Sequence, residues 1–336
     1  MRVGIDCRKI GDFGIGTYIR GLLHALADLG GADYIAFGPR EIAPMLPPGV
    51  EHAVVDAPKY SVRELFVIGR NARIDVFHAP HYVVPFLRVP FVVTIHDLIH
   101  LRHRNPAARA YARWMIGRAV RRSRAVLTVT EAVKRDIASA FGQAEKITVT
   151  PNGVDPVFHP GGAKADGRYF LFVGNEKPHK NVERLIAAAK SAGVELQRVG
   201  SKRFVSNEEL AALYRGAIAL VLPSLDEGFG LPALEAMACG TAAITSNAPA
   251  LVEITGDAAI HVTSDSRPLG FEVDEVYFLV QLSCHVFPCA DIGVLLLKRT
   301  RRKKYLTSFH TVLPQTLAQF SNFHRQGHAK AMKLER

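Results

Sequence analysis

Short apolar runs rich in β-branched residues alternate along the chain with stretches whose apolar positions repeat at helical spacing. Strands that alternate with helices are typical of parallel sheets with helices on their faces. The pattern therefore predicts an α/β protein. In the first half, the predicted strands cover residues 3–5, 34–37, 75–78, 91–95, 125–129 and 147–149.

The alternation pauses once, in a Pro- and Gly-rich loop over residues 158–167, and resumes at residues 169–173. A chain of 336 residues is longer than most single domains. We therefore predict a first domain over residues 1–160 and a second, shortened one over residues 168–264. In the second domain, strands are expected at 194–199, 218–222 and 242–245, and helices at 182–192, 207–215 and 232–238.

The alternation ends at about residue 265. Residues 276–297 are apolar but contain Gln281, His285, Pro288 and Asp291, and a basic cluster follows at 299–304. A membrane-spanning helix needs about 20 mostly apolar residues, so this stretch does not favour one. We expect residues 265–336 to form an atypical basic tail that is disordered or comes from a shifted reading frame.

Composition and charge narrow the class of protein. Hydrophobic residues make up 48% and charged residues 22% of the chain, as in ordinary globular proteins. Of the net charge of +11, the first 165 residues contribute +8, from 22 basic and 14 acidic side chains. Such asymmetry indicates an anionic partner, and no nucleic-acid motif accompanies it, so no nucleic-acid partner is expected.

Cysteine spacing and the N-terminus bear on the compartment. The four cysteines are scattered, and charges arrive too early after Met1 for the apolar region of a signal peptide. We therefore expect a cytoplasmic protein.

Open α/β sheets bind ligands beyond the carboxyl ends of their strands, so the turns that follow strands are the places for candidate residues. The first such turn holds Gly14 and Gly16 before an apolar helix. Backbone amides in a glycine turn at a helix N-terminus can approach a phosphate or a sugar. A plain tight turn explains these glycines equally well.

The second turn runs from residue 172 to residue 181 and carries Lys177 and Lys180. Lysine provides a point charge for phosphate, so this turn could bind a diphosphate. The alternative is two solvated surface lysines.

The third turn, residues 222–240, places Glu227 on a loop and Glu235 about one turn inside a helix that starts near Pro232. Gly228 and Gly230 leave backbone amides bare at the helix entrance. Carboxylates accept hydrogen bonds from hydroxyls, so the two glutamates suit a ribose diol and a sugar hydroxyl.

This last segment resembles the EX7E motif of glycosyltransferase family 4, retaining enzymes with two Rossmann-like domains that face each other across a cleft in the GT-B arrangement. Blocks such as FVVTIHDLIH, TPNGVD and FVGNEKPHKN resemble family blocks in the expected order, over about residues 1–262. The resemblance implies a catalytic set of His96, Glu227 and Lys180. It implies a donor-binding set of Gly14, Gly16, Asn175, Lys180, Glu227, Gly228, Phe229, Gly230, Leu231 and Glu235.

Three departures from the family accompany this resemblance. Asn175 and His179 stand where many members have Arg, and residues 190–205 are shorter than the family's strand-helix-strand segment there. The amphipathic helices that close the family fold are not found after residue 262.

The sequence thus predicts a retaining transferase that moves a hexose, with a mannose-like sugar favoured, from a nucleotide-diphosphate sugar to a glycan or lipid-linked acceptor in cell-surface polysaccharide synthesis. No cofactor or metal is expected. The arginine-rich stretch between Leu101 and Arg124 could lie on an anionic membrane or be a solvated face. The alternative functions are an impaired nucleotide-sugar-binding protein and a GT-B isomerase that acts on a nucleotide sugar.

Overall fold

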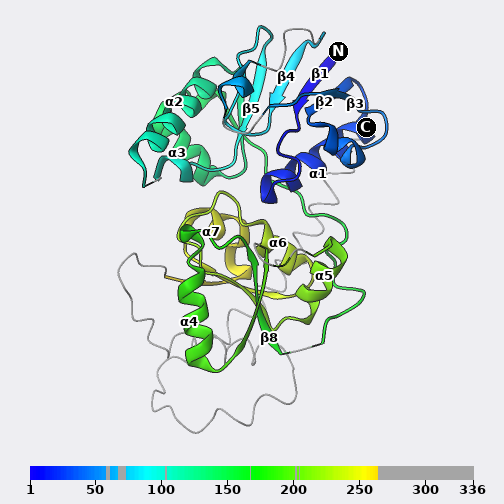
Figure 1. Cartoon of the computed structure of the whole chain (residues 1–336). Helices are drawn as coiled ribbons and strands as arrows, with labels where there is room; N and C mark the ends of the chain where they lie inside the picture. The colour runs from blue at the N-terminus through cyan, green and yellow to red at the C-terminus, as the bar shows by residue number, and fades with distance from the viewer. Residues whose placement is uncertain are drawn as a thin grey trace.

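The computed structural model describes residues 1–263 apart from 58–60, 67–72, 103, 167, 201–202 and 204. Within these residues the chain forms two parallel α/β domains, which are drawn one above the other in Figure 1. The tail expected at 265–336 lies outside the described residues.

The first domain is built on a seven-stranded sheet in the order β3-β2-β1-β4-β5-β6-β7, and every strand pair is parallel. Helices and short 3-10 turns connect the strands. The elements are β1 (Arg2–Asp6), α1 (Phe13–Leu29), β2 (Asp33–Gly38), η1 (Arg40–Met45), β3 (Glu51–Val54), η2 (Val62–Leu65), β4 (Val76–Ala79), β5 (Phe91–Ile95), η3 (Ile99–Arg102), α2 (Pro106–Arg122), β6 (Ala125–Thr128), α3 (Glu131–Phe141), η4 (Ala144–Lys146) and β7 (Ile147–Val149).

The second domain is built on a five-stranded parallel sheet in the order β12-β11-β10-β8-β9. Its elements are β8 (Tyr169–Gly174), η5 (Pro178–Lys180), α4 (Val182–Ala192), β9 (Glu195–Gly200), α5 (Asn207–Gly216), β10 (Ala219–Leu222), α6 (Leu231–Ala238), β11 (Ala242–Ser246), α7 (Pro249–Thr255), η6 (Gly256–Ala258) and β12 (Ile260–Val262).

Local sequence explains where several helices begin. The side chains of Asn105, Thr130 and Ser206 accept hydrogen bonds from first-turn amides of α2, α3 and α5. Such caps satisfy donors that have no partner inside the helix. Glycines in positive-φ conformations then follow α1, α3 and α4, at Gly30, Gly142 and Gly193.

The central strands of both sheets are mostly apolar and largely buried, which is typical of parallel sheets covered on both faces. Phe77 and Val93 are completely buried in the first core, as are Leu171 and Leu220 in the second. A ligand site is therefore expected in the loops beyond the carboxyl ends of the strands.

The predicted fold class is confirmed, and the strands and helices expected from the pattern are all present. Two strands and one α-helix were not predicted: β3, β12 and α7.

Candidate active site

In the second domain, two loops that follow neighbouring strands are joined by hydrogen bonds. Strands β8 and β10 pair side by side, so their carboxyl ends lie together. The amide of Leu225 donates to the carbonyl of His179 at 2.7 Å, and the side-chain amide of Asn181 donates to the carbonyl of Pro223 at 3.3 Å. These bonds bring Lys180 next to Glu227.

Glu227 lies in a compact polar cluster. Its Oε1 accepts hydrogen bonds from Lys180 Nζ at 2.6 Å and from Ser224 Oγ at 2.7 Å. The side chains of Lys180 and Glu227 are only 15% and 9% exposed, so the ion pair is mostly desolvated. Within the described part of the chain, Oε2 has no recorded partner and can accept a hydrogen bond from a ligand.

Glu235 lies on α6 and is 7% exposed. Its Oε2 accepts a hydrogen bond from Tyr214 Oη at 2.7 Å. Burial raises the pKa of Glu235 to about 7, although the bond from Tyr214 acts in the opposite direction. Oε1 has no recorded partner among the described residues, so this carboxyl group also has one oxygen for a ligand.

The entrance of α6 presents backbone amides. Gly230 caps this helix with φ 93°, and a Cβ atom there would lie 2.3 Å from Leu251 Cδ2, so only glycine fits. The amides of Phe229 and Gly230 have no recorded acceptor among the residues described. Together with the partial positive charge of a helix N-terminus, they form a place for negative charge.

His96 contributes from the first domain, just beyond β5. Its Nε2 lies 3.0 Å from the carbonyl of Pro80, which can only accept a hydrogen bond, so Nε2 carries a proton. Burial lowers the pKa of His96, and the imidazole is neutral at pH 7. Nδ1 is then an acceptor. The ring packs edge-to-face against Tyr18 of α1, with centroids 4.8 Å apart.

The two domains touch at this site. The backbone of Gly228 packs so closely on His96 that a Cβ atom at Gly228 would lie 2.0 Å from the His96 carbonyl oxygen. Thr130 Oγ1, from the first domain, donates to the Gly228 carbonyl at 3.0 Å. His96 and the loop with Glu227 are therefore brought together.

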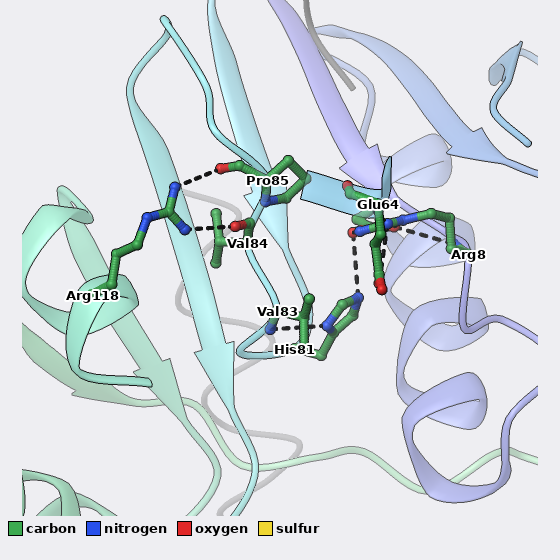
Figure 2. A network of polar contacts seen from close by, with 8 residues as sticks. Arg8, Glu64, His81, Val83, Val84, Pro85 and Arg118 are labelled. Carbon is green, nitrogen blue, oxygen red and sulfur yellow. Dashed lines mark hydrogen bonds and ion pairs between the residues drawn. The ribbon is translucent and has the colours of Figure 1, made fainter. Parts of the chain in front are cut away.

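A buried ionic network supports the first-domain side of the site, at the ends of β1 and β4 (Figure 2). Arg8 pairs with Asp6 at 2.5 Å and with Glu64 at 3.1 Å, and all three side chains are 5% exposed or less. Burial alone would raise the pKa of Asp6, but Arg8 and His81 hold it well below the usual range.

His81 joins this network through both ring nitrogens, with Val83 N donating to its Nδ1 at 3.2 Å and Nε2 lying 3.3 Å from Asp6 Oδ2. Because His81 directly follows Pro80 in the chain, the network also holds the carbonyl that orients His96.

Comparison with known proteins identifies the family. The model described as Glycosyltransferase Family 4 matches residues 14–158, and the model described as Glycosyl transferases group 1 matches residues 191–267. The chain belongs to the group 1, family 4-like glycosyltransferases. The resemblance noted in the sequence is thereby confirmed, and so is its GT-B fold of two Rossmann-like domains.

Curated proteins similar to this chain include two mannosyltransferases. The O-antigen chain mannosyltransferase RfbU of Salmonella typhimurium is 33% identical over 214 residues, which are 56% of this chain and 60% of RfbU. The MMP alpha-(1->4)-mannosyltransferase of Mycolicibacterium hassiacum is 31% identical over 246 residues, which are 59% of each chain. The chain thus spans about three fifths of the length of these relatives.

Solved structures share the fold at low sequence identity. Sucrose-phosphate synthase from Thermosynechococcus elongatus has a TM-score of 0.66 at 17% identity, and the match covers 84% of this chain and 90% of that one. HepE from Anabaena in complex with UDP-glucose has a TM-score of 0.61 at 15% identity, covering 84% and 91%.

Two predicted site residues lie inside a helix rather than in the turn before it. Gly14 and Gly16 were expected in a turn before a helix, but both lie in the first turn of α1, which starts at Phe13. The amide of Gly16 donates to the Asp12 carbonyl at 2.8 Å, and a Cβ atom there would lie 2.4 Å from the Ile10 carbonyl oxygen. Gly16 thus allows close packing of α1. Gly14 is exposed and unobstructed.

Apart from His96, the other predicted site residues lie in or beside the loops of the second domain. Lys180 and Glu227, expected at different parts of the donor, form an ion pair with each other. Asn175 uses its Oδ1 to accept a bond from the amide of Lys177 at 3.3 Å, so part of this side chain stabilises its own loop. Leu231 starts α6 directly after the bare amides.

Sequence reasoning missed two residues that contact the site, Tyr214 and Ser224, and it missed Glu253, which binds the first amides of α3 beside the site. Ser224 is three positions before Glu227, and this spacing could have indicated it. Tyr214 and Glu253 reach their partners from sequence separations of 21 and at least 121 residues, for which the chain carries no local signal.

Proposed function

We propose that this chain transfers a hexose, with a mannose-like sugar favoured, from a nucleotide-diphosphate sugar to a glycan or lipid-linked acceptor in cell-surface polysaccharide synthesis, with retention of configuration. The observation that supports the proposal is the contact of Gly228, in the loop that carries Glu227, with His96 of the first domain.

The donor would bind chiefly to the second domain. Glu235 Oε1 would accept from a ribose hydroxyl and Glu227 Oε2 from a sugar hydroxyl, since these are the carboxylate oxygens without a recorded partner among described residues. The amides of Phe229 and Gly230, with Lys180, would stabilise the diphosphate.

In the chemical step, the acceptor hydroxyl would attack the anomeric carbon from the side of the leaving diphosphate. The departing phosphate would take the proton of that hydroxyl, so no side chain is required as a covalent nucleophile. Catalysis would rest on positioning and on stabilisation of developing negative charge by Lys180 and the α6 amides. His96 Nδ1 would accept a hydrogen bond from the sugar.

The proposed mechanism requires neither a metal ion nor a cofactor. Among the described residues, no group of three or more His, Cys, Asp or Glu side chains could hold a metal ion.

For the acceptor, the proposal extends to α2. Its outer face carries Tyr111 and Trp114, 38% and 49% exposed, beside the exposed Arg109, Arg113 and Arg121. Basic helices with exposed aromatic side chains suit an anionic membrane surface, where a lipid-linked acceptor would be found.

Two arginines of the stretch between Leu101 and Arg124 do not belong to that exposed surface. Arg118 is buried and donates to the carbonyls of Val84 and Pro85 at 2.6 and 3.0 Å, as Figure 2 shows. Arg102 pairs with Asp226 of the second domain.

The localisation that fits this proposal is the cytoplasmic face of a membrane. No helix in the described ranges has the length and apolar character needed to span a bilayer. Flotation with liposomes tests the surface: binding to anionic vesicles should be lost in Trp114→Ser combined with Arg113→Glu. Equal binding of wild type and variant would remove the membrane from the proposal.

Donor use tests the enzymatic proposal. Thermal shifts with GDP-, UDP- and ADP-sugars identify the donor, because a ligand that binds the native state raises apparent stability. Transfer to an acceptor, with the anomeric configuration of the product determined by NMR, then tests the reaction. Conversion of donor alone into another nucleotide sugar would indicate an isomerase, and binding without turnover would indicate an impaired enzyme.

A further inference from the structure

The N-terminus of α3, in the first domain, is capped in part by a side chain of the second domain. The amides of Glu131 and Ala132 donate to the two carboxylate oxygens of Glu253 at 2.7 and 2.8 Å. The next two amides are satisfied locally, because Val133 donates to Thr130 Oγ1 and Lys134 to the Thr130 carbonyl. The amides at the first three positions of this helix are therefore all satisfied, two of them across the domain boundary.

Glu253 lies on α7, which is packed firmly against the donor loop. Leu251, also on α7, is fully buried and lies so close to Gly230 that it excludes a Cβ atom there. At the end of β11, just before α7, Ser246 Oγ donates to the Ser224 carbonyl, at the start of the loop that carries Glu227. Helix α7, which carries Glu253, is therefore in direct contact with this loop.

The first domain contacts the same loop directly. Thr130, the residue that caps α3, donates through its hydroxyl to the Gly228 carbonyl. Three consecutive residues, 130–132, thus bind both the donor loop and α7. An ion pair of Arg102 with Asp226 also joins the domains, but its arginine is 62% exposed, and exposed pairs contribute little. Glu253 is exposed as well, but its carboxylate accepts two backbone amides at once.

We propose that Glu253 is a positioning residue: by capping α3 across the boundary, its carboxylate holds the Glu227 loop against His96. The inference rests on the proposed function, because the loop has catalytic meaning only there. A carboxylate that accepts two amides at a helix N-terminus makes charge-assisted bonds, favoured further by the helix dipole. Glu253 therefore fixes the register in which the two halves of the site meet.

The experiment compares Glu253→Ala and Glu253→Gln with the wild-type chain. The matched control is Glu183→Ala, which removes an exposed carboxylate from α4 in the same domain. Amide hydrogen exchange at Glu131 and Ala132 is measured first. We expect at least tenfold faster exchange in E253A, an intermediate rate in E253Q, which keeps one acceptor oxygen, and no change in the control.

Turnover and nucleotide binding are measured on the same variants. We expect kcat/KM to fall at least tenfold in E253A, while the dissociation constant of the free nucleoside diphosphate stays within threefold, because Lys180 and Glu235 are untouched. Unchanged exchange in E253A would overturn the inference, and so would accelerated exchange with unchanged kcat/KM. Loss of nucleotide binding together with turnover would assign Glu253 a structural role and overturn it as well.

Failure of the proposed function gives a different result. If the wild-type chain transfers no sugar from any donor, the role of Glu253 is tested by hydrogen exchange and by the radius of gyration from small-angle scattering. E253A should then show a larger radius of gyration than the wild type and the control, because the domains separate. Equal radii with unchanged exchange would overturn it.

Discussion

Replacement of Glu235 by Gln should stabilise the protein at high pH while it abolishes sugar transfer. Burial raises the pKa of this carboxyl group from 4.5 to about 7. Below pH 4.5 the group is protonated in both folded and unfolded chains, so its burial carries no ionisation cost. As the pH rises from 4.5 to 7, the unfolded chain ionises first and the folded state loses stability relative to it.

The expected magnitude follows from this difference in pKa. Each pKa unit corresponds to about 1.4 kcal/mol, so the ionised Glu235 costs the folded state about 3 kcal/mol at pH 8. Gln cannot ionise and keeps an oxygen that accepts from Tyr214. We therefore expect Glu235→Gln to increase the free energy of unfolding by about 3 kcal/mol at pH 8 and by almost nothing at pH 4.5.

Urea unfolding at pH 4.5 and pH 8 measures this difference. Comparing the variant with the wild type at each pH cancels the contributions of all other titrating groups. Glu183→Gln, at an exposed position on α4, controls for the loss of one carboxylate. The same gain at both pH values, or no gain at pH 8, would refute the assignment of the high pKa to Glu235.

Three further substitutions test other parts of the site. Gly228→Ala should reduce the transfer rate at least about 100-fold, because its Cβ atom would strike the His96 carbonyl. Gly21→Ala is the control and should leave the rate unchanged, because a Cβ atom there meets nothing within 4 Å. Equal transfer rates in the two variants would contradict the contact between the domains. Tyr214→Phe should weaken donor binding about tenfold by calorimetry at pH 8, since it removes the hydroxyl that orients Glu235; unchanged affinity would exclude this role. Arg8→Met should cost about 3–5 kcal/mol in urea unfolding by removing the guanidinium that pairs with Asp6 and Glu64, and a loss below about 1 kcal/mol would argue against the network.

Most of the fold could be predicted because its strands carry their own signal. Residues such as Phe91–Ile95 are apolar and β-branched, and they become central buried strands. Strand β3 escapes prediction because Glu51–Val54 is a half-exposed edge strand that begins with Glu and His. Helix α7 is short, and Pro249 at its start breaks the apolar pattern that would have indicated it.

In the candidate site, too, local features could be predicted from the sequence and long-range contacts could not. The spacing of Glu227 and Glu235 around a glycine loop is local, so the sequence indicates it. Contacts across the fold are set by packing between distant segments, as in the bond of Tyr214 to Glu235 and the cap of Glu253 on α3. Helix α1 was expected to begin after Gly14 and Gly16 because glycine has low helix propensity, whereas it begins at Phe13, with Gly16 packed closely on Ile10.

The central claim is that Glu235 and Glu227 form the donor site of a retaining sugar transferase. Its most direct test is transfer from the nucleotide sugar that binds best, with wild type and Glu235→Ala assayed side by side and the product anomer determined. We expect the wild type to form product with the anomeric configuration of the donor, and Glu235→Ala to form none. Full activity in Glu235→Ala, or inversion at the anomeric carbon, would contradict the account.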